Sequence, residues 1–478
     1  MNMKKHRGFL MLMALVFGSV FLMVLGALSS VTLIQNRAQN AATGRVKALA
    51  LAEAGLEYYR WFLAHNPGDL TNGTGEEGPY VFPYNDPEGG VAGTISLAVT
   101  GNSYCGQTPA AIDIVSTGAP DDGSNMTRTV HGRYAQPTVA LYSYILNDSV
   151  WAGADRVING PYHSNGGIRM DGTTNAPVTS SLSSWICTSS FGCSPNQNVA
   201  GIFGSGPNSE LWSYPVPQVD FAGISADFSY LKTVAQASGR YLPRYSTGSS
   251  NSAAWDKGYH LIFNSDGTVT VRRVTNATQL KVIPVNSADP STDRALINNE
   301  TNYATYTLSP TCGLIFVEDK VWIEGTVLGK VTVVAANVIE TGIAPSAYLK
   351  NNITYADSDS GLTLIAEHDI LVTPDSPQNM TLNGIFIAQG GAFGRNLYRN
   401  SSNNNCHATY EPRTSLTIRG TTVSNKRTGT KWMNGCGSGD DAGYQSRTDA
   451  FDRQVATDPP PFTPIVSSDY KFVDWREE

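Results

Sequence analysis

The sequence predicts a mainly β protein that is carried on a long N-terminal transmembrane and stalk helix. We expect a small antiparallel sheet after the helix, and then a right-handed parallel β-helix, or solenoid, with long loops. Three observations predict this fold class: an apolar run without charged side chains over residues 9–34, an amphipathic continuation over residues 35–66, and short repeats that end in glycine between residues 168 and 420.

The apolar run predicts a membrane anchor. A helix needs about 20 apolar residues to cross a bilayer, and residues 9–34 form a slightly longer run. Lys4, Lys5 and Arg7 lie in the leader, residues 1–8, so the N-terminus is expected in the cytoplasm and the body on the other side. A cleaved signal peptide is the alternative, but it would have a shorter apolar core followed by a cleavage site of small residues.

Small residues recur within the apolar run at Ala14, Gly18, Gly26 and Ser30. Small residues at such spacing let membrane helices approach one another closely, which predicts a packing face. The alternative interpretation is that glycine is simply frequent in membrane helices.

The stretch after the apolar run has the periodicity of an amphipathic helix. Its apolar stripe consists of Val46, Leu49, Ala52, Leu56, Tyr59 and Leu63. Gly44 and Gly55 each cost about 1 kcal/mol relative to alanine, so this stalk needs a packing partner. Short alternating runs and polar turns over residues 67–146 predict an antiparallel sheet. We expect this sheet to cover the apolar stripe of the helix, including Val46.

The N-terminal residues carry a resemblance. Arg7-Gly8-Phe9 before the apolar run, then Asn36, Arg37 and Asn40, and Ala-Leu-Ala-Glu-Ala-Gly-Leu at residues 50–56, resemble the N-terminus of PilX-type minor pilins. Those proteins are membrane-inserted subunits of type IV pili. The resemblance implies a processing junction at Gly8 and Phe9 and other pilin-type subunits as partners. Met13 departs from the family, which usually has a glutamate there.

Composition points to a loop-rich protein outside the cytoplasm. Charged residues make up 15% of the chain, and its net charge of −7 argues against a nucleic-acid partner, which requires a basic surface. The chain has six cysteines, and an even number beyond a membrane anchor favours disulfides. The possible pairs are Cys187 with Cys193 and Cys406 with Cys436, whereas the partners of Cys105 and Cys312 stay open.

Residues 147–458 are predicted to form the β-helix. An apolar-x-apolar-x-Gly pattern occurs at residues 168–172, 321–325, 380–384 and 416–420. Strand side chains alternate, so two apolar side chains point the same way, and glycine allows the bend into the next strand. Stacked coils of this kind form a solenoid, and an ordinary β-sandwich is the alternative. Residues 459–478 are predicted to be an extended C-terminal cap over an otherwise free edge.

The body carries a second resemblance. Residues 159–168, 321–336, 361–370 and 459–475 resemble surface proteins that combine a pilin-like N-terminus with a bactofilin-like β-helical body. This resemblance implies a structural or adhesive part of the envelope or of a pilus.

No catalytic residue, cofactor or metal site is predicted. Asp357 and Asp359 form a weak candidate calcium loop, for which a solvated turn is the simpler interpretation. His163 and His368 are expected to be hydrogen-bonded residues between strands. The many aromatic residues beside polar loops, Tyr144 and Trp185 among them, either bind sugar rings or protein partners or fill the ends of coils.

These features predict a non-enzymatic, membrane-anchored, type IV pilin-like surface protein, a minor pilin or adhesin. The expected partners are membrane lipid, other pilin-type subunits, and surface glycans or proteins of a host or partner cell. Two alternatives stay open: an anchored carbohydrate-active β-helix enzyme, and a scaffold that associates with itself through the ends of its solenoid.

Overall fold

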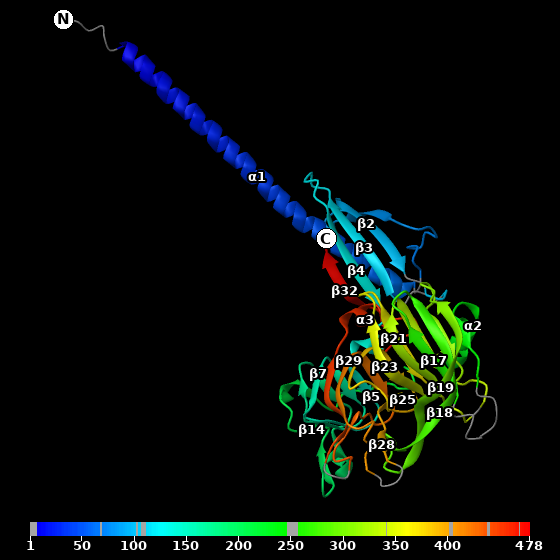
Figure 1. The fold of residues 1–478 in the computed structure, drawn as a ribbon. Coiled ribbons are helices and arrows are strands. Elements are labelled where there is room, and N and C mark those ends of the chain that lie inside the picture. The colour runs from blue at the N-terminus through cyan, green and yellow to red at the C-terminus, as the bar shows by residue number, and fades with distance from the viewer. Residues whose placement is uncertain are drawn as a thin grey trace. The chain divides into compact units, whose positions relative to one another are not determined.

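The computed structural model describes residues 7–66, 69–101, 104–106, 111–245, 257–340, 342–400, 405–436, 440–467 and 469–478. The chain is mainly β, with a long apolar N-terminal helix and an antiparallel sheet, as predicted (Figure 1). It divides into two compact units. The first comprises Met1–Gly101, Ala111–Tyr134 and Phe472–Glu478, and the second comprises Asn102–Ala110 and Ala135–Lys471.

The helix α1 (Arg7–His65) is continuous over 59 residues. Its N-terminal part exposes large apolar side chains, such as Phe9 at 64% and Leu22 at 69%. By length and composition it is the one helix among the described residues that could cross a membrane, with a mean hydropathy of 2.5 in its most apolar window. Its C-terminal part buries one side against the sheet of the first unit: Ala48, Leu51, Ala52, Leu56, Tyr59, Phe62 and Leu63.

The first unit has a five-stranded sheet. Its strands, in spatial order, are β1 (Tyr80–Asn85), β2 (Val91–Gly101), β3 (Ala111–Pro120), β4 (Arg128–Ala135) and β32 (Lys471–Glu477). β1 pairs antiparallel with β2, and β2 antiparallel with β3. Buried and partly exposed residues alternate along β3, as in a strand with one face on a core.

Glycines set how α1 lies on this sheet. A Cβ at Gly118 of β3 would be 2.2 Å from the carbonyl oxygen of Ala48, and one at Gly55 would be 2.2 Å from the Ser116 hydroxyl. The helix and strand backbones therefore touch directly, which offsets the propensity cost of Gly55. The predicted stripe is partly wrong: Val46 is 70% exposed, because the small residues turn a neighbouring face to the sheet.

The C-terminal segment differs from the predicted cap of residues 459–478. Its last strand, β32, joins β4 in the first unit, where the ring of Phe472 packs 5.5 Å from that of Tyr134. This pairing gives β4 a neighbour that an edge strand would lack. Only the proline-rich part lies on the second unit, where the Thr463 and Thr363 hydroxyls are 2.7 Å apart and Lys330 donates to the Asp458 carbonyl oxygen at 2.5 Å.

The second unit is built mainly from parallel strands. One parallel ladder runs, in spatial order, through β16 (Arg240–Leu242), β20 (Leu314–Val317), β22 (Lys330–Ala335), β24 (Gly361–Ala366), β26 (Asn379–Ala388), β29 (Arg413–Ser424), β5 (Tyr144–Leu146), β8 (Tyr162–Ser164), β11 (Val178–Ser180) and β15 (Trp212–Ser213). Another runs through β17 (Gly258–Phe263), β21 (Val321–Val327), β23 (Ala347–Tyr355), β25 (Ile370–Val372) and β27 (Phe393–Gly394).

A further parallel ladder uses the first halves of β26 and β29. It continues through β31 (Ala442–Ala450), β7 (Arg156–Asn159) and β10 (Thr173–Thr174). A separate parallel sheet contains β6 (Val150–Ala152), β9 (Ile168–Met170) and β14 (Ile202–Phe203). Inward apolar side chains of the long ladders, such as Ile323, Leu364 and Ile418, share one core cluster.

Three of the four repeat glycines lie at bends between these ladders, whereas Gly172 has no positive φ. Gly325, Gly384 and Gly420 have φ values of 111°, 156° and 132°, which residues other than glycine rarely adopt. Gly384 and Gly420 are register partners, and a Cβ on Gly420 would be 2.0 Å from the Gly384 carbonyl oxygen. Glycine is therefore needed both for the bend and for the close stacking of neighbouring strands.

The strand order has a feature that the sequence did not predict. The chain enters the long ladder in its middle, at β5, and extends it to β15. It then passes through α2 (Phe228–Ala237) to the opposite end at β16 and builds back until β29 pairs with β5 and β31 with β7. We call the contact between these late and early strands the seam.

A buried ion pair crosses the seam. Arg156 and Asp449 lie 2.6 Å apart with side chains 6% and 4% exposed. The Tyr144 hydroxyl donates to Asp449 at 3.0 Å, and the Arg156 guanidinium lies 4.3 Å from the centre of the Tyr144 ring. Removing either charge would leave the other buried and unpaired.

A long antiparallel hairpin covers part of the second unit. It consists of β18 (Thr268–Ile283) and β19 (Ser291–Thr307), and the sequence did not predict it. The Trp322 indole donates to the Ala295 carbonyl oxygen at 2.6 Å, which fixes the hairpin to β21. The shorter elements are η1 (Val139–Leu141), β12 (Ser184–Cys187), η2 (Ser189–Phe191), β13 (Gln197–Ala200), η3 (Ser209–Leu211), β28 (Leu397–Arg399), β30 (Lys431–Trp432) and α3 (Arg453–Thr457).

Candidate functional site

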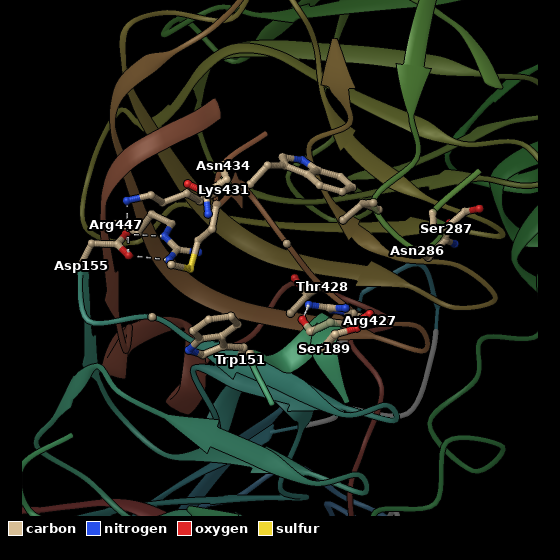
Figure 2. A pocket seen from close by; sticks show the side chains of 18 residues that line it. Trp151, Asp155, Ser189, Asn286, Ser287, Arg427, Thr428, Lys431, Asn434 and Arg447 are labelled. Atoms are coloured by element: carbon tan, nitrogen blue, oxygen red, sulfur yellow. Dashed lines mark hydrogen bonds and ion pairs between the residues drawn. The ribbon is translucent and has the colours of Figure 1, made fainter. Parts of the chain in front are cut away.

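A cavity of about 580 Å³ opens within the second unit (Figure 2). Stretches that are far apart in the sequence line it, and we call it the groove. Its lining comprises Trp151, Gly153, Asp155, Ser189, Ser190, Gly192, Val285, Asn286, Ser287, Ala288, Arg427, Thr428, Gly429, Lys431, Trp432, Met433, Asn434 and Arg447. In Figure 2, Asp155 and Arg447 lie on one side, and Asn286 and Ser287 on the other.

A disulfide-closed loop forms one wall. Cys187 is bonded to Cys193, six residues along, and the enclosed turn presents Ser189 and Ser190 to the groove. The Trp185 ring packs edge-on against Phe191 at 5.0 Å beneath this turn. Because the covalent link restricts the loop, this wall is held in place before any ligand arrives.

Trp151 is fixed by polar partners. Its indole nitrogen donates to the Asp171 carboxylate at 2.7 Å, and Asp171 also accepts from the Arg169 guanidinium at 2.8 Å. That guanidinium stacks 4.1 Å from the centre of the Trp151 ring. The ring therefore stands at the groove in a defined orientation.

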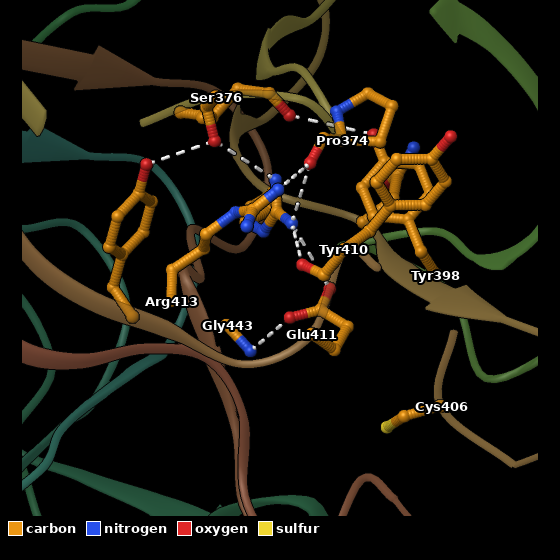
Figure 3. A network of polar contacts seen from close by, with 12 residues as sticks. Pro374, Ser376, Tyr398, Cys406, Tyr410, Glu411, Arg413 and Gly443 are labelled. Carbon is orange, nitrogen blue, oxygen red and sulfur yellow. Dashed lines mark hydrogen bonds and ion pairs between the residues drawn. The ribbon is translucent and has the colours of Figure 1, made fainter. Parts of the chain in front are cut away.

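Trp432 is hydrogen-bonded to the backbone of a buried arginine. Its indole nitrogen donates to the Arg395 carbonyl oxygen at 3.0 Å. The Arg395 side chain is fully buried; it donates to the Tyr410 carbonyl oxygen at 2.6 Å and pairs with Glu411 at 3.4 Å. Glu411 in turn accepts from the Gly443 amide at 2.7 Å, so the network reaches β31 (Figure 3).

A second disulfide stabilises the same region. Cys406 is bonded to Cys436, which follows Met433 and Asn434 of the groove. Both pairs are those that the cysteine positions suggested. Cys105, whose partner the sequence left open, is bonded to Cys312 across a sequence separation of 207. All described cysteines are therefore paired.

The basic side chains of the groove differ in their partners. Arg447 binds Asp155 through two contacts of 2.9 and 3.0 Å, and Lys431 lies 3.7 Å from Asp155 and 3.2 Å from Asp441. Burial opposes ionisation of Asp155, but Arg447 and Lys431 outweigh it and lower the pKa of that carboxyl. Asp155 is therefore a charged structural partner of these two cations.

Arg427 is the exception. It donates to the Ser190 carbonyl oxygen at 2.8 Å, and its guanidinium lies 4.4 Å from the centre of the Phe191 ring. Within the described part of the chain, no carboxylate forms an ion pair with it. Burial lowers the pKa of Arg427, and the negative charge of Asp148 opposes this shift without forming an ion pair.

The groove offers groups for binding. In its described lining, Asp155 is the one carboxylate, whereas glycoside hydrolysis generally uses a pair. Two indoles, amide and hydroxyl groups, and the Arg427 guanidinium, which forms no ion pair among the described residues, can stack on, hydrogen-bond to and neutralise a ligand.

The weak calcium candidate has a local explanation. The Asp357 carboxylate accepts from the Asp359 amide at 3.1 Å and from the Ser360 hydroxyl at 2.6 Å, which is the pattern of an Asx turn. No group of three or more potential metal ligands occurs among the residues that the structure describes. The two histidines that the sequence singled out are hydrogen-bonded: His163 to Thr179 at 2.9 Å, and His368 to Asp369 at 3.0 Å.

The predicted N-terminal sites lie on α1. Gly8 and Phe9 are in its first turns, and residues 1–6 of the leader lie outside the described part. Ala14, Gly18, Gly26 and Ser30 lie in the exposed segment, and a Cβ on Gly18 or Gly26 would meet nothing within 4 Å. The packing face and the processing junction stay predictions.

Sequence reasoning missed the groove itself. The aromatic residues that it singled out include Tyr144, which is buried in the core, while Trp151 and Trp432 were overlooked. One signal was present: Lys426, Arg427 and Lys431 crowd together immediately before Trp432 in an otherwise acidic chain.

Comparisons with known proteins give little further information. No family model and no curated protein match the chain. Among solved structures, the crystal structure of the competence-associated pilin ComZ from Thermus thermophilus matches with 12% identity and a TM-score of 0.28, over 91% of this chain and 98% of that chain. This TM-score is too low to define a shared fold.

Proposed function

We propose that the chain is a non-enzymatic, membrane-anchored, pilin-like surface protein that displays an adhesive or structural head. One observation carries the proposal: α1 is a single helix whose first part exposes an apolar surface and whose last part is buried against an antiparallel sheet. Exposed side chains such as Phe17, at 63%, and Phe21, at 63%, need lipid or another apolar helix around them.

The exposed part of α1 would serve both anchoring and assembly. Residues 9–34 are long enough to cross a bilayer, and the basic leader would keep the N-terminus in the cytoplasm. Gly18 and Gly26 leave open space on the helix surface, which suits close packing with the helices of other pilin-type subunits.

The second unit would be a right-handed parallel β-helix displayed outside the cytoplasm. Its parallel ladders with a shared apolar core and its stacked glycine bends support this architecture. Its disulfides favour an oxidising compartment. Surface glycans or proteins of a partner cell would bind this head.

Sequencing the N-terminus of the native protein tests the proposal. We expect a chain that begins at Phe9 and co-purifies with sheared pili. A Gly8→Arg variant should keep its leader, whereas Gly18→Ala, a matched change in open space, should be processed normally. An intact Met1 in the membrane fraction, with none in sheared pili, would contradict incorporation into a pilus.

A further inference from the structure

The groove has the charge of an anion site. Three basic side chains, Arg427, Lys431 and Arg447, line it against one carboxylate, Asp155, and Asp441 beside the lining also pairs with Lys431. The whole chain has a net charge of −7, so this surface differs from the average of the molecule. Lys431 and Arg447 form ion pairs with Asp155 or Asp441. Asp148 acts on Arg427 electrostatically but forms no ion pair with it, so Arg427 is the basic side chain of the lining without an ion pair in the described part of the chain.

The groove also has features of a sugar site. Indole rings stack on the apolar faces of sugars, and Trp151 and Trp432 both border the groove. Each is fixed through its indole nitrogen, so little order has to be imposed when a ligand binds. Asn286 and Ser287, exposed on the connection between β18 and β19, add hydrogen-bonding groups for hydroxyls.

We propose that the groove binds a carboxylate-bearing sugar chain, with Arg427 pairing the carboxylate and the two indoles contacting the sugar rings. A planar carboxylate matches the guanidinium fork in two parallel hydrogen bonds, which a neutral sugar cannot supply. This inference rests on the proposed function, because it names the chemical class that an adhesive head would recognise.

The structure accounts for how the site is kept ready. The Ser190 carbonyl oxygen, in the loop closed by Cys187 and Cys193, accepts from Arg427 at 2.8 Å and aims the guanidinium. The disulfide between Cys406 and Cys436 closes the segment that contains Trp432. Walls held by covalent links lower the entropy cost of binding a flexible chain.

Binding to the full-length protein in detergent tests the inference. The probes are oligomers of galacturonic acid and of glucuronic acid and a sialylated oligosaccharide, and the control is the methyl ester of the galacturonic acid oligomer. We expect at least one acidic probe to bind, and its neutral ester or neutral counterpart to bind at least tenfold more weakly, since a charge-assisted hydrogen bond contributes about 1.5–3 kcal/mol.

Variants separate the site from general charge. Arg427→Gln should weaken acidic-sugar binding by about tenfold or more. Lys426→Gln removes the same charge one residue away, at an exposed side chain outside the lining, and should change binding less than threefold, roughly the effect of a screened surface charge. Asn286→Ala changes an exposed side chain and should weaken binding by a smaller factor than Arg427→Gln.

Each of the following results would overturn the inference: no binding of any acidic probe at millimolar concentration, equal binding of the neutral ester, or equal effects of Arg427→Gln and Lys426→Gln. Inorganic phosphate that competes as well as the acidic sugar would show a general anion site and would also overturn it. A native chain that begins at Phe9 in sheared pili, together with no sugar binding, would leave the proposed function intact while rejecting this ligand class.

Discussion

Replacing Asp449 by asparagine tests whether the seam closes the second unit. The change keeps the shape of the side chain but leaves the Arg156 guanidinium without its charge partner, in a place where both side chains are at most 6% exposed. Breaking a buried ion pair in this way destabilises a protein by about 3–5 kcal/mol. At about 2 °C for each kcal/mol in a large domain, the melting temperature should fall by about 6–10 °C.

The first unit provides a matched control. Asp113 pairs with Arg133 at 2.7 Å, but its side chain is 37% exposed, so Asp113→Asn should cost less than about 1 kcal/mol. Thermal unfolding of the full-length protein in detergent, followed by circular dichroism, measures both variants. Equal melting temperatures for the two variants would refute the argument that the seam holds the late strands to the early ones.

Two further predictions concern packing and pH. Gly118→Ala should destabilise the first unit by about 1–3 kcal/mol in a urea titration, because its Cβ would overlap the Ala48 carbonyl, whereas Gly18→Ala should not. Burial opposes the charged form of His260, but Glu300 at 2.8 Å and Glu324 at 3.0 Å outweigh it and raise the His260 pKa above 6.5. The stability that the charged His260 contributes is fully present below pH 6.5 and is lost as the pH rises through its raised pKa. Over this pH range, the melting temperature of the wild type should therefore fall more than that of His260→Gln.

Local patterns in the sequence predicted the features that depend on local physics. The absence of charge over residues 9–34 predicted a continuous apolar helix, and α1 shows one. Three of the four repeat glycines marked real bends, because Gly325, Gly384 and Gly420 have backbone angles that other residues rarely adopt. The arrangement of the resulting strands as a right-handed β-helix stays a prediction.

Features that depend on distant residues were not predictable in the same way. The periodicity predicted that Val46 faces the sheet. In the structure Val46 is exposed, because the face of α1 that contains Ala48 lies against Gly118 of the sheet. The pairing of β32 with β4 joins residues more than three hundred positions apart, and nothing in the local sequence of Phe472 indicates its partner.

The groove was not predictable because its lining residues are far apart in the sequence. Trp151, Asn286 and Arg427 come from separate parts of the chain and meet only when the seam has formed and the long hairpin is in place. Single-sequence reasoning sees each of them as an ordinary loop or strand residue. The close spacing of basic residues before Trp432 is the one local feature that pointed to this site.

Protease treatment of intact cells tests most directly the central claim that an apolar stem holds a displayed β-rich body. The account predicts that external protease removes the body from intact cells and leaves a short fragment containing α1 that only detergent extracts from the membrane. A body that is protected until the cells are opened, or a full-length protein that salt alone releases from the membrane, would contradict it.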